Sequence, residues 1–328
     1  MTVSICLSLM LSAQGAEVGV PGQGHASNPK WSPDGQWLAF EVNDYGGALD
    51  LYLVRIQDGM ATESPTKVTA AGDRGSQFSG GGRVVATPVW HPRGMLFFEG
   101  SRSGSNTRFY ERRPNSPQVG ELLSRSRIDG DLSWATISPD GMWLSFVSDS
   151  SGAGDIFRWT YGASEVEKIV SSPYSEMAPQ YNEDGSRLVY SRKHRGGQDI
   201  FVWEGASPLP WIGGSGDQSR PVWSGQDVVY FTDERGEGRW DIAVSGAPGQ
   251  KSVVARDVRL PQRATPALTP DGQWVAYGVE DPEQSGRITF SRLSGSGSTS
   301  FDSGFAACGE PALIEVESRI YMAYTALS

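Results

Sequence analysis

Histidine, the side chain that most often binds transition metals, is scarce in this chain. Only three histidines occur among 328 residues: His25, His91 and His194. None has a second His or Cys at the short spacing typical of metal motifs. We therefore expect neither a metal site nor another cofactor.

Basic residues and long runs of helix-forming residues are also few. The chain has 28 Lys and Arg against 38 Asp and Glu, a formal charge of -10. This balance argues against nucleic acid or an anionic membrane surface as the main partner. With 41 Gly, 20 Pro and 11 Trp, and few long runs of Ala, Leu, Glu and Lys, the composition predicts an all-β protein.

The N-terminus is typical of an export signal. Residues 2–11 form an apolar stretch of about ten residues, too short to span a bilayer, and residues 13–15 (AQG) supply the small residues of a cleavage site. We therefore expect a signal peptide over residues 1–15, a single mature domain over residues 16–328, and a periplasmic or secreted protein. The alternative is a strand, because Val3, Ile5, Leu7 and Leu9 alternate with polar or small residues.

Cysteine usage agrees with this assignment. Cys6 lies in the predicted signal peptide, which leaves Cys308 alone in the mature chain. A single thiol forms no internal disulfide, so packing and strand pairing must hold the fold together.

An internal repeat dominates the sequence. Four close copies read NPKWSPDGQWLAF at 28–40, WATISPDGMWLSF at 134–146, APQYNEDGSRLVY at 178–190 and TPALTPDGQWVAY at 265–277. Weaker copies at 87–98, 220–231 and 310–321 bring the total to seven, and after a first interval of 59 residues the copies start 42 to 47 residues apart. That period is the length of one propeller blade.

Each copy predicts a meander of four short strands. The large apolar residues of the first strands, expected in an inner layer, are Trp31, Trp90, Ile137, Tyr181, Trp223, Leu268 and Leu313. An Asp-Gly pair then makes a tight turn, in which Asp caps its own backbone and Gly accepts a positive φ. These structural turn residues are Asp34, Gly35, Asp140, Gly141, Asp184, Gly185, Asp271 and Gly272. The second strand ends in an aromatic residue, and most third strands open with Asp and an aliphatic residue.

This pattern of Ser-Pro-Asp-Gly turn, apolar strand, Gly-rich loop and Asp-Ile-aromatic resembles the WD-like repeats of TolB-type β-propellers. The resemblance implies a β-propeller of about seven four-stranded blades, with six as the alternative count. Because the repeats begin near the start of the sequence, we expect no counterpart of the TolB N-terminal domain. The seventh copy stops at Ser328 after its second strand, so the last blade is either incomplete or closed by the N-terminal segment.

Catalytic motifs are missing. The sequence has no Gly-x-Ser-x-Gly elbow and no Walker or Rossmann fingerprint, and we expect no hydrolase domain after the repeats. Aspartates that recur in several copies are expected to shape turns rather than to catalyse. We therefore expect a protein-binding scaffold that is not an enzyme. The alternative is a glycan or small-molecule enzyme, a lyase or glycosidase, with carboxylates at the channel mouth.

The longer loops are expected to share one face, where basic and aromatic residues gather within an acidic protein. The candidate partner-binding residues are Tyr45, Arg102, Arg192, Lys193, His194, Arg195 and Arg235. Such a cluster fits a protein partner, either an envelope protein or an acidic peptide, bound by a monomer. The alternative is that these loops are simply solvated.

Overall fold

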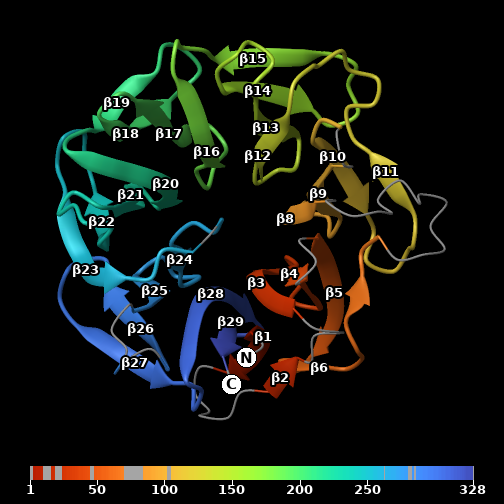
Figure 1. The fold of residues 1–328 in the computed structure, drawn as a ribbon, viewed down its shortest axis with the longest axis vertical. Helices are drawn as coiled ribbons and strands as arrows, with labels where there is room; N and C mark the ends of the chain where they lie inside the picture. Colours follow the sequence, from red (N-terminus) through yellow and green to blue (C-terminus); the bar gives the residue numbers. More distant parts are fainter. Residues whose placement is uncertain are drawn as a thin grey trace. The chain divides into compact units, whose positions relative to one another are not determined.

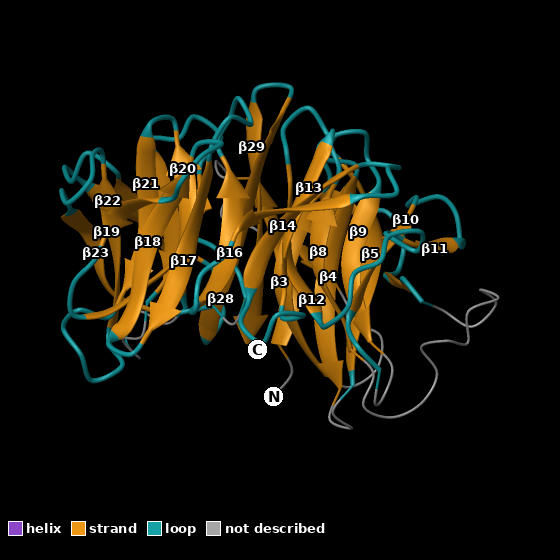
Figure 2. Ribbon diagram, turned by 90° about the horizontal axis from the view of Figure 1, so that it is seen from above, coloured by secondary structure: helices purple, strands orange, loops and turns teal. Residues whose placement is uncertain are grey.

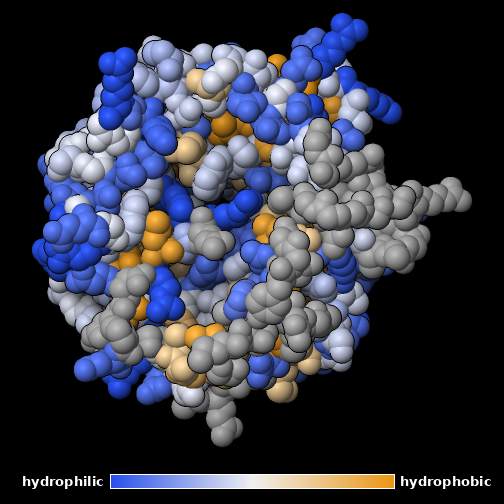
Figure 3. Space-filling model, viewed as in Figure 1, coloured by the Kyte–Doolittle hydropathy of each residue, from blue (hydrophilic) through white to orange (hydrophobic). Residues whose placement is uncertain are grey.

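The computed structural model describes residues 3–9, 16–18, 24–44, 48–69, 84–101, 105–261, 263–279, 283 and 286–327. Within these ranges the chain is all-β, as the composition predicted, and Figure 2 shows strands joined by loops and turns without a helix. No helix in the described part is long and apolar enough to cross a membrane. In the view of Figure 3, hydrophilic residues dominate the surface and apolar residues form separate patches.

The chain divides into two units. Unit 1 comprises residues 1–122, 261–290 and 298–328, and unit 2 comprises residues 123–260 and 291–297. Each unit is built from antiparallel meanders of neighbouring strands.

In unit 1, two meanders follow each other along the chain (Figure 1). The first contains β3 (Gly24–Trp31), β4 (Trp37–Asp44) and β5 (Leu49–Gln57), with the short β6 (Met60–Ala61) and β7 (Thr66–Lys67) on β5. The second contains β8 (Val84–Trp90), β9 (Leu96–Ser101), β10 (Arg108–Arg112) and β11 (Val119–Glu121). A further sheet, mostly in unit 1, contains β24 (Ala267–Leu268), β25 (Trp274–Gly278), β26 (Arg287–Arg292) and β27 (Ser298–Asp302).

Unit 2 contains three meanders of the same kind. The first is β12 (Leu132–Ile137), β13 (Trp143–Ser148), β14 (Asp155–Thr160) and β15 (Val166–Val170). The second is β16 (Ser175–Tyr181), β17 (Leu188–His194), β18 (Gly197–Trp203) and β19 (Leu209–Ile212). The third is β20 (Gly216–Ser224), β21 (Asp227–Thr232), β22 (Trp240–Ser245) and β23 (Ser252–Val258).

The N-terminal and C-terminal segments share one sheet in unit 1. Strand β29 (Arg319–Leu327) lies between β28 (Ala307–Val316) and β1 (Val3–Leu9), and β2 (Ala16–Val18) pairs with β1 (Figure 1). The Cys6 and Leu7 side chains are fully buried there. The N-terminal segment thus completes the last sheet. Residues 3–9, assigned from sequence to a signal peptide, form the strand that was the alternative, while residues 10–15 lie outside the described part.

The core of each sheet explains the repeated aromatic residues. The aromatic residue predicted to end the second strand lies inside it, because the strand continues for two to four residues beyond the aromatic. Its ring stacks on an aromatic ring of the third strand, with centroids 5.8 to 6.0 Å apart. These pairs are Phe40–Tyr52, Phe98–Tyr110, Phe146–Phe157 and Tyr190–Phe201. Offset stacking adds about 0.5–1.5 kcal/mol to the burial of each pair.

The Asp-Gly pairs sit in tight turns between first and second strands. Asp34 Oδ1 accepts hydrogen bonds from the Ser32 hydroxyl and the Gln36 amide, at 2.6 and 3.0 Å. Gly35 takes φ = 68°, and Gly141, Gly185 and Gly272 also have positive φ. Asp140 and Asp271 each accept a bond from a hydroxyl two residues earlier and an amide two residues later, and Asp184 accepts the Ser186 amide. The hydrogen bonds to Ser138 and Met142 lower the pKa of Asp140.

Candidate functional site

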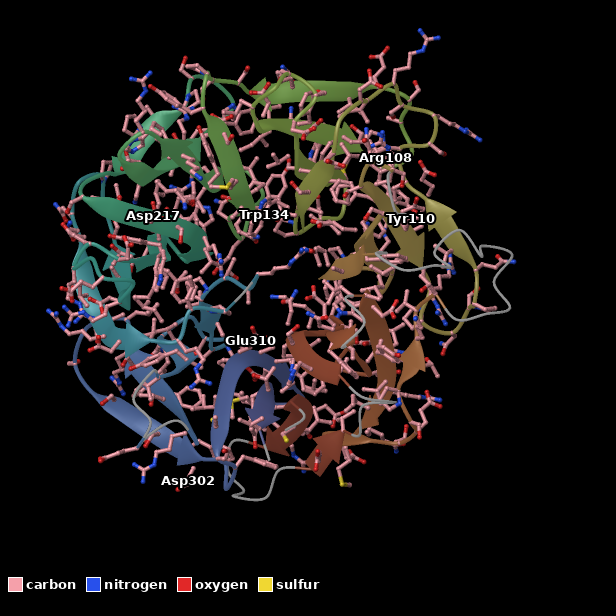
Figure 4. The ribbon with its side chains drawn as sticks, in the orientation of Figure 1. Arg108, Tyr110, Trp134, Asp217, Asp302 and Glu310 are labelled. Carbon is pink, nitrogen blue, oxygen red and sulfur yellow. The ribbon has the colours of Figure 1, made fainter. Side chains whose placement is uncertain are left out.

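A backbone distortion recurs in the first strands. The residue before the repeat's proline or alanine has positive φ, although none of these residues is glycine: Asn28, Thr87, Trp134, Ala178, Arg220 and Glu310, with φ from 47° to 56°. The strand register shifts at the same places. Trp134 and Glu310 are labelled on β12 and β28 in Figure 4. Such strained positions persist only where their surroundings hold them in place.

The amide freed by this distortion finds its acceptor in a neighbouring repeat. In unit 2 the Arg220 amide donates to Ser191 Oγ at 3.1 Å. In unit 1 the Thr87 amide donates to Glu41 Oε1 at 2.7 Å. Glu41 and Ser191 occupy equivalent positions, directly after the aromatic residue of the second strand that stacks on the third strand.

Two glutamates depart from the repeat at this position. By strand register it is occupied by Val147, Ser191, Phe231, Gly278 and Thr325 in five copies, but by Glu41 and Glu99 in the other two. Both glutamates are buried, with 3% and 6% of their surface exposed. A buried carboxylate is costly unless hydrogen bonds or counter-charges compensate it, so two in successive repeats need an explanation beyond the fold.

A continuous polar network in unit 1 supplies that compensation. Glu310 Oε2 accepts the Asn28 amide at 2.7 Å, and Asn28 Nδ2 donates to Glu41 Oε1 at 2.9 Å. Glu41 Oε1 also accepts the Thr87 amide, as described above. We call the residues of this chain of contacts, together with those of the next paragraph, the carboxylate network.

The network continues through an arginine. Arg263 Nη1 donates to Thr87 Oγ1 at 3.0 Å and lies 3.6 Å from Glu99 Oε2. Residues from β28, β3, β4, β8 and β9 and from the segment before β24 are thereby connected. The carboxylate network comprises Asn28, Glu41, Thr87, Glu99, Arg263 and Glu310.

A pocket of about 380 Å³ lies beside this network, entirely within unit 1. Its lining comes from β3 and the following turn, from Trp90, from residues 264–268 and from β28. Four of the large apolar residues predicted for the first strands line it: Trp31, Trp90, Leu268 and Leu313. Lys30 and Glu310 are its charged lining residues.

The two tryptophans are held in place by hydrogen bonds to neighbouring strands. Trp31 Nε1 donates to the Ala312 carbonyl, and Trp90 Nε1 donates to the Lys30 carbonyl, both at 3.0 Å. Because each indole N–H is already used, the rings offer mainly carbon to the pocket. Pro29, Pro266 and Pro311, which have no N–H, extend this apolar lining.

Lys30 is the unusual charge in the pocket. It is half-buried, and within the described ranges its ammonium forms no ion pair shorter than 4.0 Å. Burial lowers the pKa of Lys30 below its ordinary value of 10.5, while Glu41 and Glu310 oppose the shift. Perturbed ionisable groups concentrate at binding and catalytic sites.

The predicted loop cluster is only partly available for binding. Tyr45 and Arg102 lie outside the described residues. Arg192 is engaged inside unit 2: its Nε lies 2.9 Å from Glu176 Oε1, its Nη2 donates to the Tyr190 hydroxyl, and its guanidinium lies 4.1 Å from the Phe201 ring centroid. Arg235 is engaged as well, through Asp241 and Asp257, which raise the pKa of its guanidinium.

The remaining members lie at the turn between β17 and β18. His194 Nδ1 accepts the Gly196 amide, and Nε2 lies 3.0 Å from Asp199 Oδ2. Lys193 and Arg195 are exposed, and neither forms an ion pair with the described residues. Tyr174, which the sequence did not single out, is 44% exposed and packs edge-on against His194 at 6.5 Å. The structure therefore brings Lys193, Arg195 and Tyr174 together as the free part of the cluster.

Sequence reasoning missed Lys30, Glu41, Glu99, Arg263 and Glu310. A signal for two of them was present, because Glu41 and Glu99 break the repeat at a position where the other copies have small or apolar residues. Lys30, Arg263 and Glu310 had no comparable signal, since their meeting depends on contacts between distant repeats.

No protein family model matches the chain. An uncharacterized peptidase of Bacillus subtilis is 26% identical over 145 residues, which are 43% of this chain and 21% of the peptidase. An uncharacterized protein of Agrobacterium fabrum is 23% identical over 244 residues, which are 62% of this chain and 83% of that protein. The chain thus matches about a fifth of the peptidase's length.

Solved structures of several proteins share the fold. A puromycin-hydrolyzing peptidase of Mycobacterium tuberculosis aligns with a TM-score of 0.65 at 16% identity, over 90% of this chain and 48% of the peptidase. An oligogalacturonate lyase of Vibrio parahaemolyticus aligns with a TM-score of 0.56 at 12% identity, over 98% of this chain and 97% of the lyase. TolB of Agrobacterium tumefaciens aligns with a TM-score of 0.55 at 16% identity, over 77% of this chain and 90% of TolB. The fold is therefore β-propeller-like, as the resemblance implied.

These comparisons correct one expectation. The absence of catalytic motifs led to the prediction that the chain is not an enzyme. That prediction is wrong, because the similar proteins include peptidases and a lyase. Propellers bring together catalytic groups from separate repeats, and such sites leave no short motif in the sequence.

Proposed function

We propose that this chain is a β-propeller of seven four-stranded blades that serves as a scaffold for binding a segment of a partner protein. The observation that carries the proposal is the pocket in unit 1, where Trp31, Trp90, Leu268 and Leu313 surround Lys30 and Glu310. The likeness to TolB supports the scaffold role at the level of the fold. The proposal takes each meander described above as one blade and the sheet of β28, β29, β1 and β2 as the last.

The character of the pocket favours a peptide. Its volume lies at the lower end of the range for ligand sites, about 300–1,000 Å³. The two tryptophans, whose indole N–H groups are hydrogen-bonded, and the prolines form a rigid apolar surface. An apolar anchor side chain of a peptide gains most of its binding free energy in a rigid apolar pocket. The two charged residues then set the orientation of the bound segment.

The test is selection from a synthetic peptide library, followed by affinity measurements on variants. Leu313→Arg places a long charged side chain in the pocket and should weaken the selected peptides at least about tenfold, or about 1.4 kcal/mol. Leu209→Arg is the matched control, because Leu209 is an exposed leucine of unit 2. Peptides that bind both variants as tightly as the unchanged protein would contradict the proposal.

A second function is favoured by the place of Lys30 in the pocket lining beside Glu310. Burial lowers the pKa of Lys30, and an amine whose pKa is lowered is better suited to remove a proton from a bound substrate than an ordinary lysine. The similarity to an oligogalacturonate lyase makes acidic sugars the first substrates to examine. Incubation with uronate oligomers, monitored by the ultraviolet absorbance of a new double bond, should then reveal activity that Lys30→Met abolishes. No absorbance change at any pH tested would reject this function.

We also propose that the protein works outside the cytoplasm and meets an acidic partner segment at Lys193 and Arg195. Fractionation of the producing cells tests the location, and recovery of the protein solely with the cytoplasmic fraction would contradict it. Neutralising Lys193 and Arg195 together should weaken such a partner and flatten its salt dependence, because exposed charge pairs are screened by salt.

A further inference from the structure

We propose that the pocket in unit 1 selects ligands that present a single carboxylate beside an apolar group, with the Lys30 ammonium as the partner of the carboxylate. This inference rests on the proposed binding function and names the chemistry of the ligand. The free C-terminus of a peptide and an acidic side chain next to an apolar residue both have this chemistry.

Two lysines of the described ranges, Lys30 and Lys67, are half-buried, and they differ in their partners. Lys67 pairs with Asp50, as the half-buried Arg192 pairs with Glu176 at 2.9 Å. Lys30 has no such partner within the described ranges, and it lines a pocket. An arriving carboxylate would supply the missing ion pair.

The two carboxylates whose charges act on Lys30 already accept hydrogen bonds from other groups. Glu41 accepts hydrogen bonds from Asn28 Nδ2 and the Thr87 amide, and Glu310 accepts the Asn28 amide. Both accept hydrogen bonds from donors at the strained positions of the first strands, so neither can turn toward Lys30 without leaving buried donors unpaired. The ammonium is therefore left for a ligand.

The rest of the lining determines what accompanies the carboxylate. Most of the lining around Lys30 is indole, proline, leucine, isoleucine and alanine, with the hydroxyl residues Ser32 and Thr265 and the carboxylate of Glu310. Lys30 is the sole cation among the lining residues. An apolar group that is buried against this lining gains binding free energy in proportion to the apolar area removed from water. Glu310 repels a second negative charge, so dicarboxylates and phosphates are disfavoured relative to a monocarboxylate.

Binding of a carboxylate should be coupled to proton uptake. The charged groups that face Lys30 are Glu41 on β4 and Glu310 on β28, and both favour its protonated form, whereas burial opposes it. A bound carboxylate adds a third favourable charge and raises the Lys30 pKa. Affinity should accordingly fall as the pH rises through the pKa of Lys30 in the complex.

The experiment compares N-acetyl-leucine with N-acetyl-leucinamide, which differ in the carboxylate alone. Binding is followed by nuclear magnetic resonance of the Trp31 and Trp90 indole N–H groups, assigned with single Trp→Phe variants. The unchanged protein should bind the acid about five- to tenfold more tightly than the amide, as expected for one charge-assisted contact. Lys30→Met should bind both equally, and Lys30→Arg should restore the preference.

A third probe, N-acetyl-Asp-Leu-amide, distinguishes the two sources of the carboxylate. If it binds as the acid does, a side-chain carboxylate suffices; if it binds as the amide does, the site reads a free C-terminus. Equal affinity for acid and amide in the unchanged protein, or a preference that persists in Lys30→Met, would overturn the inference. Selected peptides that depend on the pocket but not on a carboxylate would refute this inference alone, whereas peptides insensitive to Leu313→Arg would refute the binding function.

Discussion

Arg192 Nε lies 2.9 Å from Glu176 Oε1, and the Glu176 side chain is fully buried. This ion pair joins adjacent strands β16 and β17, in which the two residues face each other in register. Burial raises the pKa of Glu176, although the Ser172 hydroxyl and Arg192 act in the opposite direction. Arg192 is therefore part of the structure of unit 2, whereas its neighbour Arg195 is exposed.

The first prediction contrasts these two arginines. Arg192→Gln should lower the free energy of unfolding by about 3 kcal/mol, because it leaves a buried carboxylate without its counter-charge. Arg195→Gln should change it by less than about 0.5 kcal/mol. Urea unfolding of the two variants measures both effects, and equal stabilities would contradict the role given to Arg192.

A second prediction concerns Lys30 and pH. The pKa of Lys30 in the folded protein lies below 10.5, its ordinary value in the unfolded chain. Between these two pKa values the unfolded chain binds more protons than the folded protein. The contribution of Lys30 to the free energy of unfolding therefore rises with pH in that window. Lys30→Met removes the group, so the variant should be more stable than the unchanged protein at about pH 7, and the gain should shrink toward about pH 10. Unfolding experiments at both pH values test this. A stability difference that is independent of pH would show that burial does not perturb Lys30.

The third prediction concerns strand β1. Removal of residues 1–15 exposes the edge of β29 and removes the buried Cys6 and Leu7 side chains. We expect a loss of several kcal/mol, since each buried apolar side chain is worth about 1.5–3 kcal/mol, and a tendency to aggregate through the open edge.

Leu7→Ala provides the matched control for this deletion. It keeps the whole chain and should still cost about 2–5 kcal/mol if β1 is packed as described. If neither the truncation nor Leu7→Ala shifts the unfolding midpoint, the segment does not contribute to the fold, and its assignment to a removable signal peptide would be favoured instead.

The sequence predicted those parts of the fold that repeat. The all-β class, the meanders and their aromatic second strands follow from a local pattern of strand and turn residues, which is physically encoded within a dozen positions. The alternation of residues 3–9 gave strand β1 only as the alternative to an export signal, because both have this apolar character. The partner of β1, β29, is some 320 residues away in the chain.

The candidate site was largely invisible from sequence for the same reason. Arg192 was selected because basic residues cluster at positions 192–195, but its charge is neutralised by Glu176, which lies 16 residues earlier. Conversely, Lys30 stands in an ordinary repeat, and its lack of an ion partner becomes evident only when β3, β4 and β28 are together. Charge compensation depends on distant pairings, which local patterns do not reveal.

Photo-crosslinking tests the central claim, that the pocket in unit 1 is the binding site, most directly. A peptide selected for binding is made with a benzophenone side chain at its apolar anchor, irradiated with the protein, and the modified residues are located by mass spectrometry. The account predicts adducts on Trp31, Trp90, Leu268 or Leu313, which excess unlabelled peptide abolishes. Adducts confined to unit 2 around Lys193 and Arg195 would contradict it.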